Sequence, residues 1–162
     1  RNDGYGRQGD YRQFMVGPHR TLIADAGLID PHWPTPWAVD ATPLQQLIID
    51  EEFDKRPELI RPSVGIAEWI LPTILRAAPP ELQERFMQPT LRGELAWCQL
   101  FSEPGAGSDL ASLTTRATKV EGGWRINGHK IWTSSAHRAD VVALRSALSL
   151  PASRGGWRRG SA

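Results

Sequence analysis

Cysteine, net charge and long apolar runs are all scarce in this sequence of 162 residues. The single cysteine, Cys98, excludes an intrachain disulfide and is compatible with a reducing compartment. The formal net charge of +1 gives no overall attraction to nucleic acid. No apolar run approaches the length of a membrane span, and the N-terminus is too polar for a secretory signal. We therefore predict a cytoplasmic protein without a membrane span or a nucleic-acid partner.

Basic residues gather at the end of the chain. The segment 145–162 holds four arginines and no acidic residue, and Ser, Ala and Gly fill most of the rest without any periodicity. This composition predicts an unstructured basic tail. A shifted reading frame in GC-rich coding sequence gives the same bias, so both interpretations of the tail stay open.

The N-terminal part of the chain has the apolar spacing of helices. Thr42-Pro43 has the form of an N-cap followed by proline in the first turn. Pro72 falls inside an apolar run and predicts a kink there. The predicted helices cover His19–Ala26, Leu44–Lys55, Val64–Arg76 and a short segment from Pro80 to Pro89.

After Gly93 the pattern changes to strands. Asn127-Gly128 is a two-residue hairpin signal, and Glu121-Gly122-Gly123 predicts another turn. The expected strands cover Leu95–Ser102, Thr114–Val120, Trp124–Ile126, His129–Ser134 and Asp140–Leu144. Helices followed by antiparallel strands predict an α+β fold. We divide it into an N-terminal helical domain (1–94), a partial β domain (95–144) and the tail (145–162).

The most informative segment is Phe101–Asp109, which reads Phe-Ser-Glu-Pro-Gly-Ala-Gly-Ser-Asp. Pro104 fixes the direction of the chain, while Gly105 and Gly107 leave no Cβ to obstruct a ligand. The loop amides and Ser108 offer donors to an anion or a carbonyl. The loop has neither a Walker lysine nor a following helix, so it is not a P-loop or a dinucleotide fingerprint. A plain turn is the ordinary alternative.

The complete string Glu103–Asp109 resembles the signature of the acyl-CoA dehydrogenase family. The segment Gly123–Ser134 is similar to a second β motif of that family, in which an Asn-Gly step leads to a tryptophan beside the flavin. The resemblance extends over roughly Ala24–Leu144 and is expected to end there. It implies an N-terminal helical domain, part of a middle β domain, and no C-terminal helical domain.

The resemblance implies an FAD site built from two segments of the chain. The strand Gln99–Ser102 would lie along the flavin, with hydroxyl donors at Ser102 and Ser134 and the ring of Trp132 against the isoalloxazine. Ser108 and Phe101 would line the acyl-CoA thioester. Core packing for Trp132 and satisfied strand hydroxyls for the two serines are the alternatives. The implied cofactor-binding residues are Gln99, Phe101, Ser102, Trp132, Thr133 and Ser134.

In this family the catalytic base lies in the C-terminal helical domain, which nothing after Leu144 resembles. We therefore predict no catalytic residue in the chain and no turnover by the isolated chain. The family implies acyl-CoA as substrate, electron-transfer flavoprotein or a similar acceptor, and a dimer or tetramer that is doubtful for this chain. A non-catalytic FAD- or acyl-CoA-binding partner subunit and a degraded product are the alternatives.

The remaining polar residues have plainer interpretations. Glu103 precedes Pro-Gly and is predicted to hold its own turn rather than to act in catalysis. Lys130 and Arg138 are interpreted as a solvated face in preference to a site for the CoA phosphates. His129 and His137 have no partners at metal-ligand spacing, so no metal site is predicted.

Overall fold

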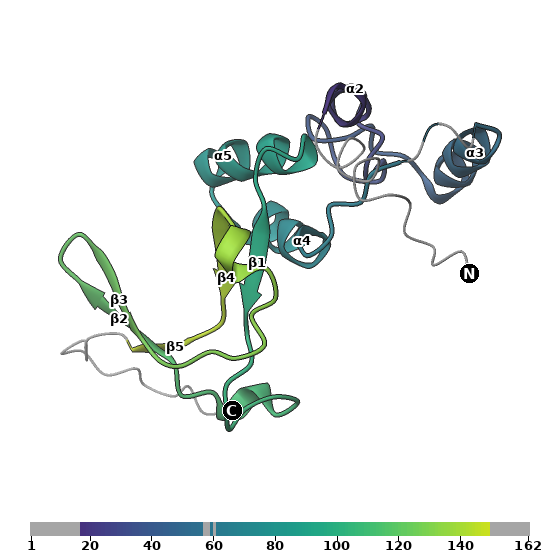
Figure 1. Ribbon diagram of the computed structural model, residues 1–162. Coiled ribbons are helices and arrows are strands. Elements are labelled where there is room, and N and C mark those ends of the chain that lie inside the picture. Colours follow the sequence, from purple (N-terminus) through teal and green to yellow (C-terminus); the bar gives the residue numbers. More distant parts are fainter. Residues whose placement is uncertain (1–16, 57–58, 60, 150–162) are drawn as a thin grey trace, which may run out of the picture. The chain divides into compact units, whose positions relative to one another are not determined.

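The computed structural model describes residues 17–56, 59 and 61–149. Helices come first along the chain and strands follow (Figure 1). The chain separates into two compact units, one comprising residues up to Trp97 together with His137–Val141, the other comprising Cys98–Ala136 and the residues from Val142 onward. The predicted α+β class is confirmed.

Unit 1 is helical and has a core of large apolar side chains. Its helices are α2 (Pro18–Asp25), α3 (Pro43–Asp54), α4 (Ala67–Ala77) and α5 (Pro80–Leu91). Each predicted helix is present, although α4 begins three residues after Val64 and contains Pro72. Side chains from α2, α4 and α5 fill the core, including Ile23, Ile70, Leu71, Met87 and Leu91.

The predicted cap of α3 is present as a capping box. The Gln45 backbone N–H donates to Thr42 Oγ1 at 3.4 Å, and the Thr42 backbone N–H donates to Gln45 Oε1 at 2.8 Å. Two donors that the first helical turn leaves without an intrahelical partner are thereby satisfied. This local chemistry specifies the start of α3, a helix that buries none of its own residues.

The prediction that Pro89 ends α5 is wrong, because the helix continues to Leu91. Proline removes one helical N–H, but side-chain contacts hold the turn that follows it. The Thr90 hydroxyl donates to the Phe86 carbonyl at 2.6 Å. The buried guanidinium of Arg20 donates to the carbonyls of Leu91 and Thr90 at 2.7 and 3.1 Å. A side chain from α2 thus satisfies the carbonyls at the C-terminus of α5.

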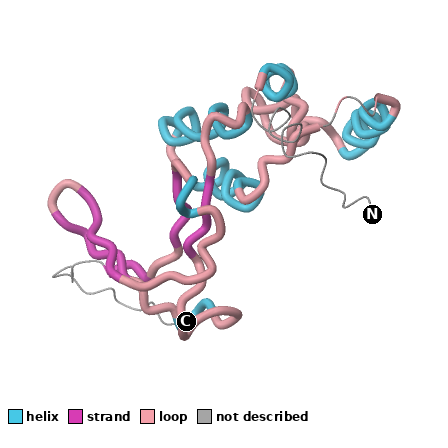
Figure 2. The backbone as a smooth tube through the Cα atoms, in the orientation of Figure 1, coloured by secondary structure: helices cyan, strands magenta, loops and turns pink. Residues whose placement is uncertain are grey.

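Unit 2 contains strands joined by long loops (Figure 2). The central strand β2 (Arg116–Val120) pairs antiparallel with β3 (Gly123–Asn127) and parallel with β5 (Ala147–Ser149). The strands β1 (Trp97–Leu100) and β4 (Val141–Leu144) form a second sheet, and the boundary between the units falls inside β1.

Two predictions about the β region are wrong. Residues 147–149 of the predicted unstructured tail form β5, because the Ala147 backbone N–H bonds to the Thr115 carbonyl at 2.8 Å and the strand then pairs with β2. That pairing is parallel, whereas only antiparallel pairing was expected. Residues 150–162 of the tail lie outside the described residues, as do residues 1–16 at the other end of the chain.

The second wrong prediction is the returning strand His129–Ser134, which is a loop in the structure. The other predicted turn, at Glu121-Gly122-Gly123, is confirmed, since it joins β2 and β3 as a hairpin. Gly128 has a different role, since a Cβ there would lie 2.1 Å from Thr115 Oγ1 and 2.7 Å from Thr115 Cα. Glycine at this position therefore permits close packing of the loop against Thr115 rather than a tight turn.

Candidate functional site

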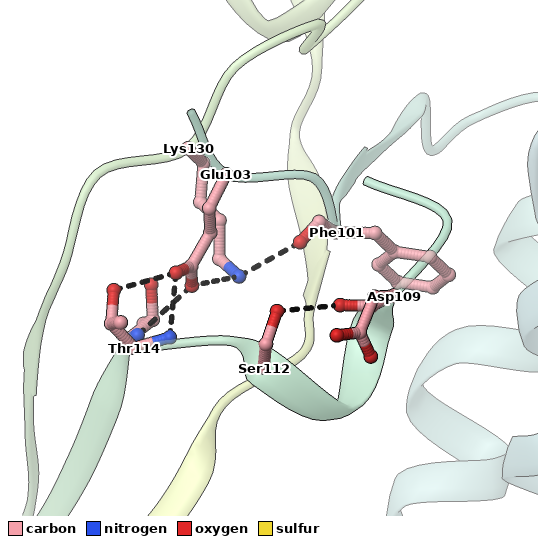
Figure 3. A network of polar contacts seen from close by, with 7 residues as sticks. Phe101, Glu103, Asp109, Ser112, Thr114 and Lys130 are labelled. Carbon is pink, nitrogen blue, oxygen red and sulfur yellow. Dashed lines mark hydrogen bonds and ion pairs between the residues drawn. The ribbon is translucent and has the colours of Figure 1, made fainter. Parts of the chain in front are cut away.

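The two sequence motifs meet within unit 2. The Ile131 backbone N–H donates to the Ser102 carbonyl at 3.0 Å. Lys130 Nζ donates to the Phe101 carbonyl at 2.9 Å, as Figure 3 shows. Consecutive residues of the 128–134 loop thus bind consecutive carbonyls after β1. The end of β1 and the loop that carries Trp132 form one connected structure.

Glu103 is the centre of the polar contacts that join these segments. Its carboxylate accepts from the Thr114 N–H at 2.6 Å, the Thr114 hydroxyl at 2.7 Å, the Thr115 N–H at 2.9 Å and Lys130 Nζ at 2.8 Å (Figure 3). Only 3% of the Glu103 surface is exposed. The Lys130 ammonium, then Thr115 and Thr114, hold the pKa of Glu103 well below its usual range. The carboxylate therefore stays ionised at neutral pH.

This arrangement corrects two interpretations of the sequence. Glu103 does more than hold its own turn, because its side chain binds residues 11 and 12 positions further along the chain. Lys130 does not belong to a solvated face, since 8% of its side chain is exposed and it pairs with Glu103. The pairing of a loop carboxylate with a lysine 27 positions away depends on tertiary structure.

The glycine loop projects from this anchored base. The backbones of Glu103 and Ala106 exchange two hydrogen bonds, of 2.9 and 3.1 Å, which close a tight turn. Gly105 and Gly107 are exposed, and a Cβ at either position would meet no atom within 4 Å. The packing of the described chain therefore does not require glycine at these positions. Close approach of a ligand to the loop backbone is a physical reason for both glycines.

Among the residues that the structure describes, Trp132 has the most exposed large apolar side chain, with 82% of its surface accessible. Its φ angle is 56°, in the left-handed region that bulky residues rarely adopt. Such backbone strain concentrates at ligand sites, and an exposed indole offers a flat face for stacking. Within the described residues Trp132 is not packed in a core.

The other candidate residues lie on the same two segments. Gln99 is in β1, while Phe101 and Ser102 directly follow that strand; all three are half-buried. Thr133 is half-buried, and Ser134 and Ser108 are exposed. The guanidinium of Arg145 lies over the Phe101 ring, 5.7 Å from its centroid, a contact that sequence reasoning missed. Arg145 belongs to no sequence motif, so no signal in the sequence indicated its contact with Phe101.

Two further classes of feature are absent from the described part of the chain. No group of three or more His, Cys, Asp or Glu side chains is arranged to hold a metal ion there. Among the helices described, none has both the length and the apolar character needed to cross a bilayer.

Comparison with known proteins decides the family. Residues 98–156 match the model of the acyl-CoA dehydrogenase middle domain. Acyl-CoA dehydrogenase FadE34 of Mycobacterium tuberculosis is 54% identical over 120 residues, which cover 74% of this chain and 17% of FadE34. The chain belongs to the acyl-CoA dehydrogenase family. The family match continues past Leu144 to residue 156, so the predicted end of the resemblance was wrong.

Solved structures of acyl-CoA dehydrogenases have the same fold. The ChsE4-ChsE5 complex of Mycobacterium tuberculosis aligns with a TM-score of 0.63 and 26% identity, over 86% of this chain and 39% of that chain. The Tcur3481-Tcur3483 steroid acyl-CoA dehydrogenase aligns with the same score and identity, over 37% of its chain. The chain thus spans about a sixth of FadE34 and under two fifths of these solved chains.

Proposed function

We propose that this chain contributes one wall of the FAD site in a flavin-dependent acyl-CoA dehydrogenase. The observation that carries the proposal is the contact between Ile131 and Ser102, which joins the end of β1 to the loop of Trp132. The open space above the glycine loop and the exposed indole of Trp132 fit a flat ligand. The proposed FAD-contacting residues are Gln99, Phe101, Ser102, Trp132, Thr133 and Ser134.

The chemistry of several of these residues supports a specific role. Ser102 and Ser134 would donate hydrogen bonds to the polar edge of the flavin, and Trp132 would stack on the ring and exclude water. Ser108 and Phe101 would line the acyl thioester. When bound, FAD supplies the hydride acceptor for α,β-dehydrogenation of an acyl-CoA. A carboxylate base is also needed, and we assign none to this chain, so the isolated chain is expected to show no turnover.

The domain boundaries, partners and location belong to the same proposal. We assign residues 1–94 to an N-terminal helical domain and the residues from 95 onward to the middle domain, whose family match runs to residue 156. Electron-transfer flavoprotein or a similar protein is the proposed acceptor. The buried free thiol of Cys98 is compatible with a cytoplasmic location. A second candidate is a flavin-binding subunit that another chain completes, and the two-protein ChsE4-ChsE5 complex favours it.

Titration of the purified chain with FAD tests the proposal. We expect saturable quenching of flavin fluorescence, with binding roughly tenfold weaker in Trp132→Ala, about 1.4 kcal/mol of lost stacking. Trp124→Ala is the matched control, because Trp124 is also an exposed tryptophan of unit 2 but lies on β3. The control should bind like the native chain.

Absence of FAD binding by the native chain, or equal losses in the two variants, would refute the flavin wall. Dye reduction by an acyl-CoA separates the two candidate functions. Binding without turnover, followed by turnover when a second chain is added, identifies the partner-completed subunit. Turnover by the chain alone contradicts the absence of a catalytic base.

A further inference from the structure

The ion pair of Glu103 and Lys130 has no role in the flavin site as described so far. It is the only ion pair in the described part of the chain in which both side chains are buried, with 3% and 8% of them exposed. The remaining salt bridges join side chains that are 31% to 65% exposed. Burying two opposite charges is costly and is a weak source of stability. The pair therefore invites a functional explanation.

Geometry connects the pair to the proposed flavin wall. Lys130 Nζ holds the Phe101 carbonyl and the Glu103 carboxylate, and the next residue, Ile131, holds the Ser102 carbonyl. Glu103 in turn binds Thr114 and Thr115, which directly precede β2. When both carbonyls after β1 are held in this way, the orientation of the intervening peptide groups is fixed. The first of these peptide groups carries the Ser102 N–H, and the two together fix the direction in which the Ser102 hydroxyl would face a flavin.

The charges of Glu103 and Lys130 also lie close to the proposed flavin wall. Glu103 directly follows Ser102, and Lys130 lies two residues before Trp132. The intact pair is neutral overall, whereas loss of either partner leaves one buried charge next to the site. A reduced flavin carries more negative charge than an oxidised one. An unpaired carboxylate would therefore disfavour reduction, and an unpaired ammonium would favour it.

We propose that Glu103 and Lys130 are positioning residues of the flavin site, which orient the Phe101–Ser102 backbone and keep the local charge neutral beside the cofactor. This inference rests on the proposed FAD site. It assigns no proton transfer to either residue. Its distinctive consequence is that removing the two partners moves the flavin midpoint potential in opposite directions, which a loss of structure alone does not produce.

The first measurement is the midpoint potential of FAD bound to the full chain. Lys130→Met should lower the potential and Glu103→Gln should raise it, while the double variant should return toward the native value. Lys119→Met and Glu121→Gln are the matched controls, because both side chains are exposed and belong to unit 2. The controls should leave the potential unchanged.

The second measurement is amide hydrogen exchange at Ile131, whose N–H binds the Ser102 carbonyl. Both single variants should exchange at this amide at least about tenfold faster than their controls, since the segment is no longer held. Lys130→Arg keeps the charge and should preserve the native potential. If Lys130→Met fails to fold, the comparison of Lys130→Arg with Glu103→Gln decides the question.

The outcomes separate this inference from the function on which it rests. A native chain that binds no FAD overturns both. A chain that binds FAD, with potentials that shift in the same direction in both single variants or do not shift, overturns the charge balance alone. Unchanged exchange at Ile131 in both variants overturns the orienting role.

Discussion

The Glu103 carboxylate connects three segments of unit 2 through four hydrogen bonds: its own loop, the residues directly before β2 and the loop that carries Lys130. Each bond favours the ionised form, so the pKa of Glu103 is well below the ordinary 4.5 of a glutamate. Protonation would weaken all of these contacts at once. The ionisation of this one buried carboxylate therefore makes the stability of unit 2 depend on pH.

The direction of this pH dependence follows from linkage. Because the pKa of Glu103 is lower in the folded chain than in the unfolded chain, its contribution is complete above 4.5 and is lost as the pH falls toward the folded pKa. We expect the free energy of unfolding of the native chain to fall below about pH 4.5. Glu103→Gln should lack this part of the decline.

Thermal melts across this pH range measure the effect. Glu121→Gln is the control, because Glu121 is an exposed carboxylate in the β2–β3 turn. It should keep the native acid dependence. Parallel pH profiles for the Glu103 and Glu121 variants would contradict the assignment of the acid sensitivity to Glu103.

At Gly128, the addition of a single Cβ atom is expected to affect stability. A Cβ there would meet both the side chain and the backbone of Thr115, and backbone atoms do not move aside easily. Gly128→Ala should reduce the free energy of unfolding by about 1–3 kcal/mol through overpacking. Gly123→Ala is the control, since a Cβ at Gly123 meets nothing within 4 Å. Equal denaturant midpoints for these two variants would argue against the close approach.

Helix α4 illustrates how an element is held by one face. Ala67, Ile70 and Leu71 are buried, whereas Trp69 is 75% exposed. Leu71→Ala should reduce the free energy of unfolding by about 2–5 kcal/mol, because the side chain is fully buried among apolar neighbours. Trp69→Ala should change it by less than about 0.5 kcal/mol. Chemical denaturation of both variants measures the difference. Similar losses of unfolding free energy in the two variants would contradict the assignment of the packed face of α4.

The end of α5 depends on contacts that lie outside the element. Pro89 would ordinarily end the helix, yet α5 continues to Leu91 because Arg20 of α2 binds the last carbonyls. The start of α3 is the opposite case, since Thr42 and Gln45 cap it locally. Helix ends built from adjacent residues are visible in the sequence, and those held by a distant side chain are not.

At the level of the whole molecule, the two units are stabilised differently. Unit 1 buries large side chains such as Leu71, Met87 and Leu91. In the described part of unit 2, the buried apolar residues are small: Cys98, Ala106 and Ala117. Hydrophobic burial scales with apolar area, so unit 2 depends more on the polar contacts of Glu103. The proposed ligand site thus lies in the unit that is held together chiefly by charge and hydrogen bonds.

The sequence by itself determined the order of helices and strands and the family. Periodicity, caps and turn residues act over a few positions, so the sequence shows them directly. The uninterrupted motif Glu103–Asp109 is specific for the family by its sequence alone. The sequence also assigned the candidate site to two segments, the end of β1 and the loop through Trp132, and the structure brings these segments into contact.

Only the tertiary structure decided which distant residues pair. The Glu103–Lys130 pair joins positions 27 apart, and β5 forms by parallel pairing with β2 across the sequence between them. The role of Gly128 likewise depends on Thr115, which lies against it. A hairpin turn was expected at Gly128, but the structure has a closely packed loop there. Local patterns carry no information about such contacts, because their free energy depends on burial and on partners that the fold brings together.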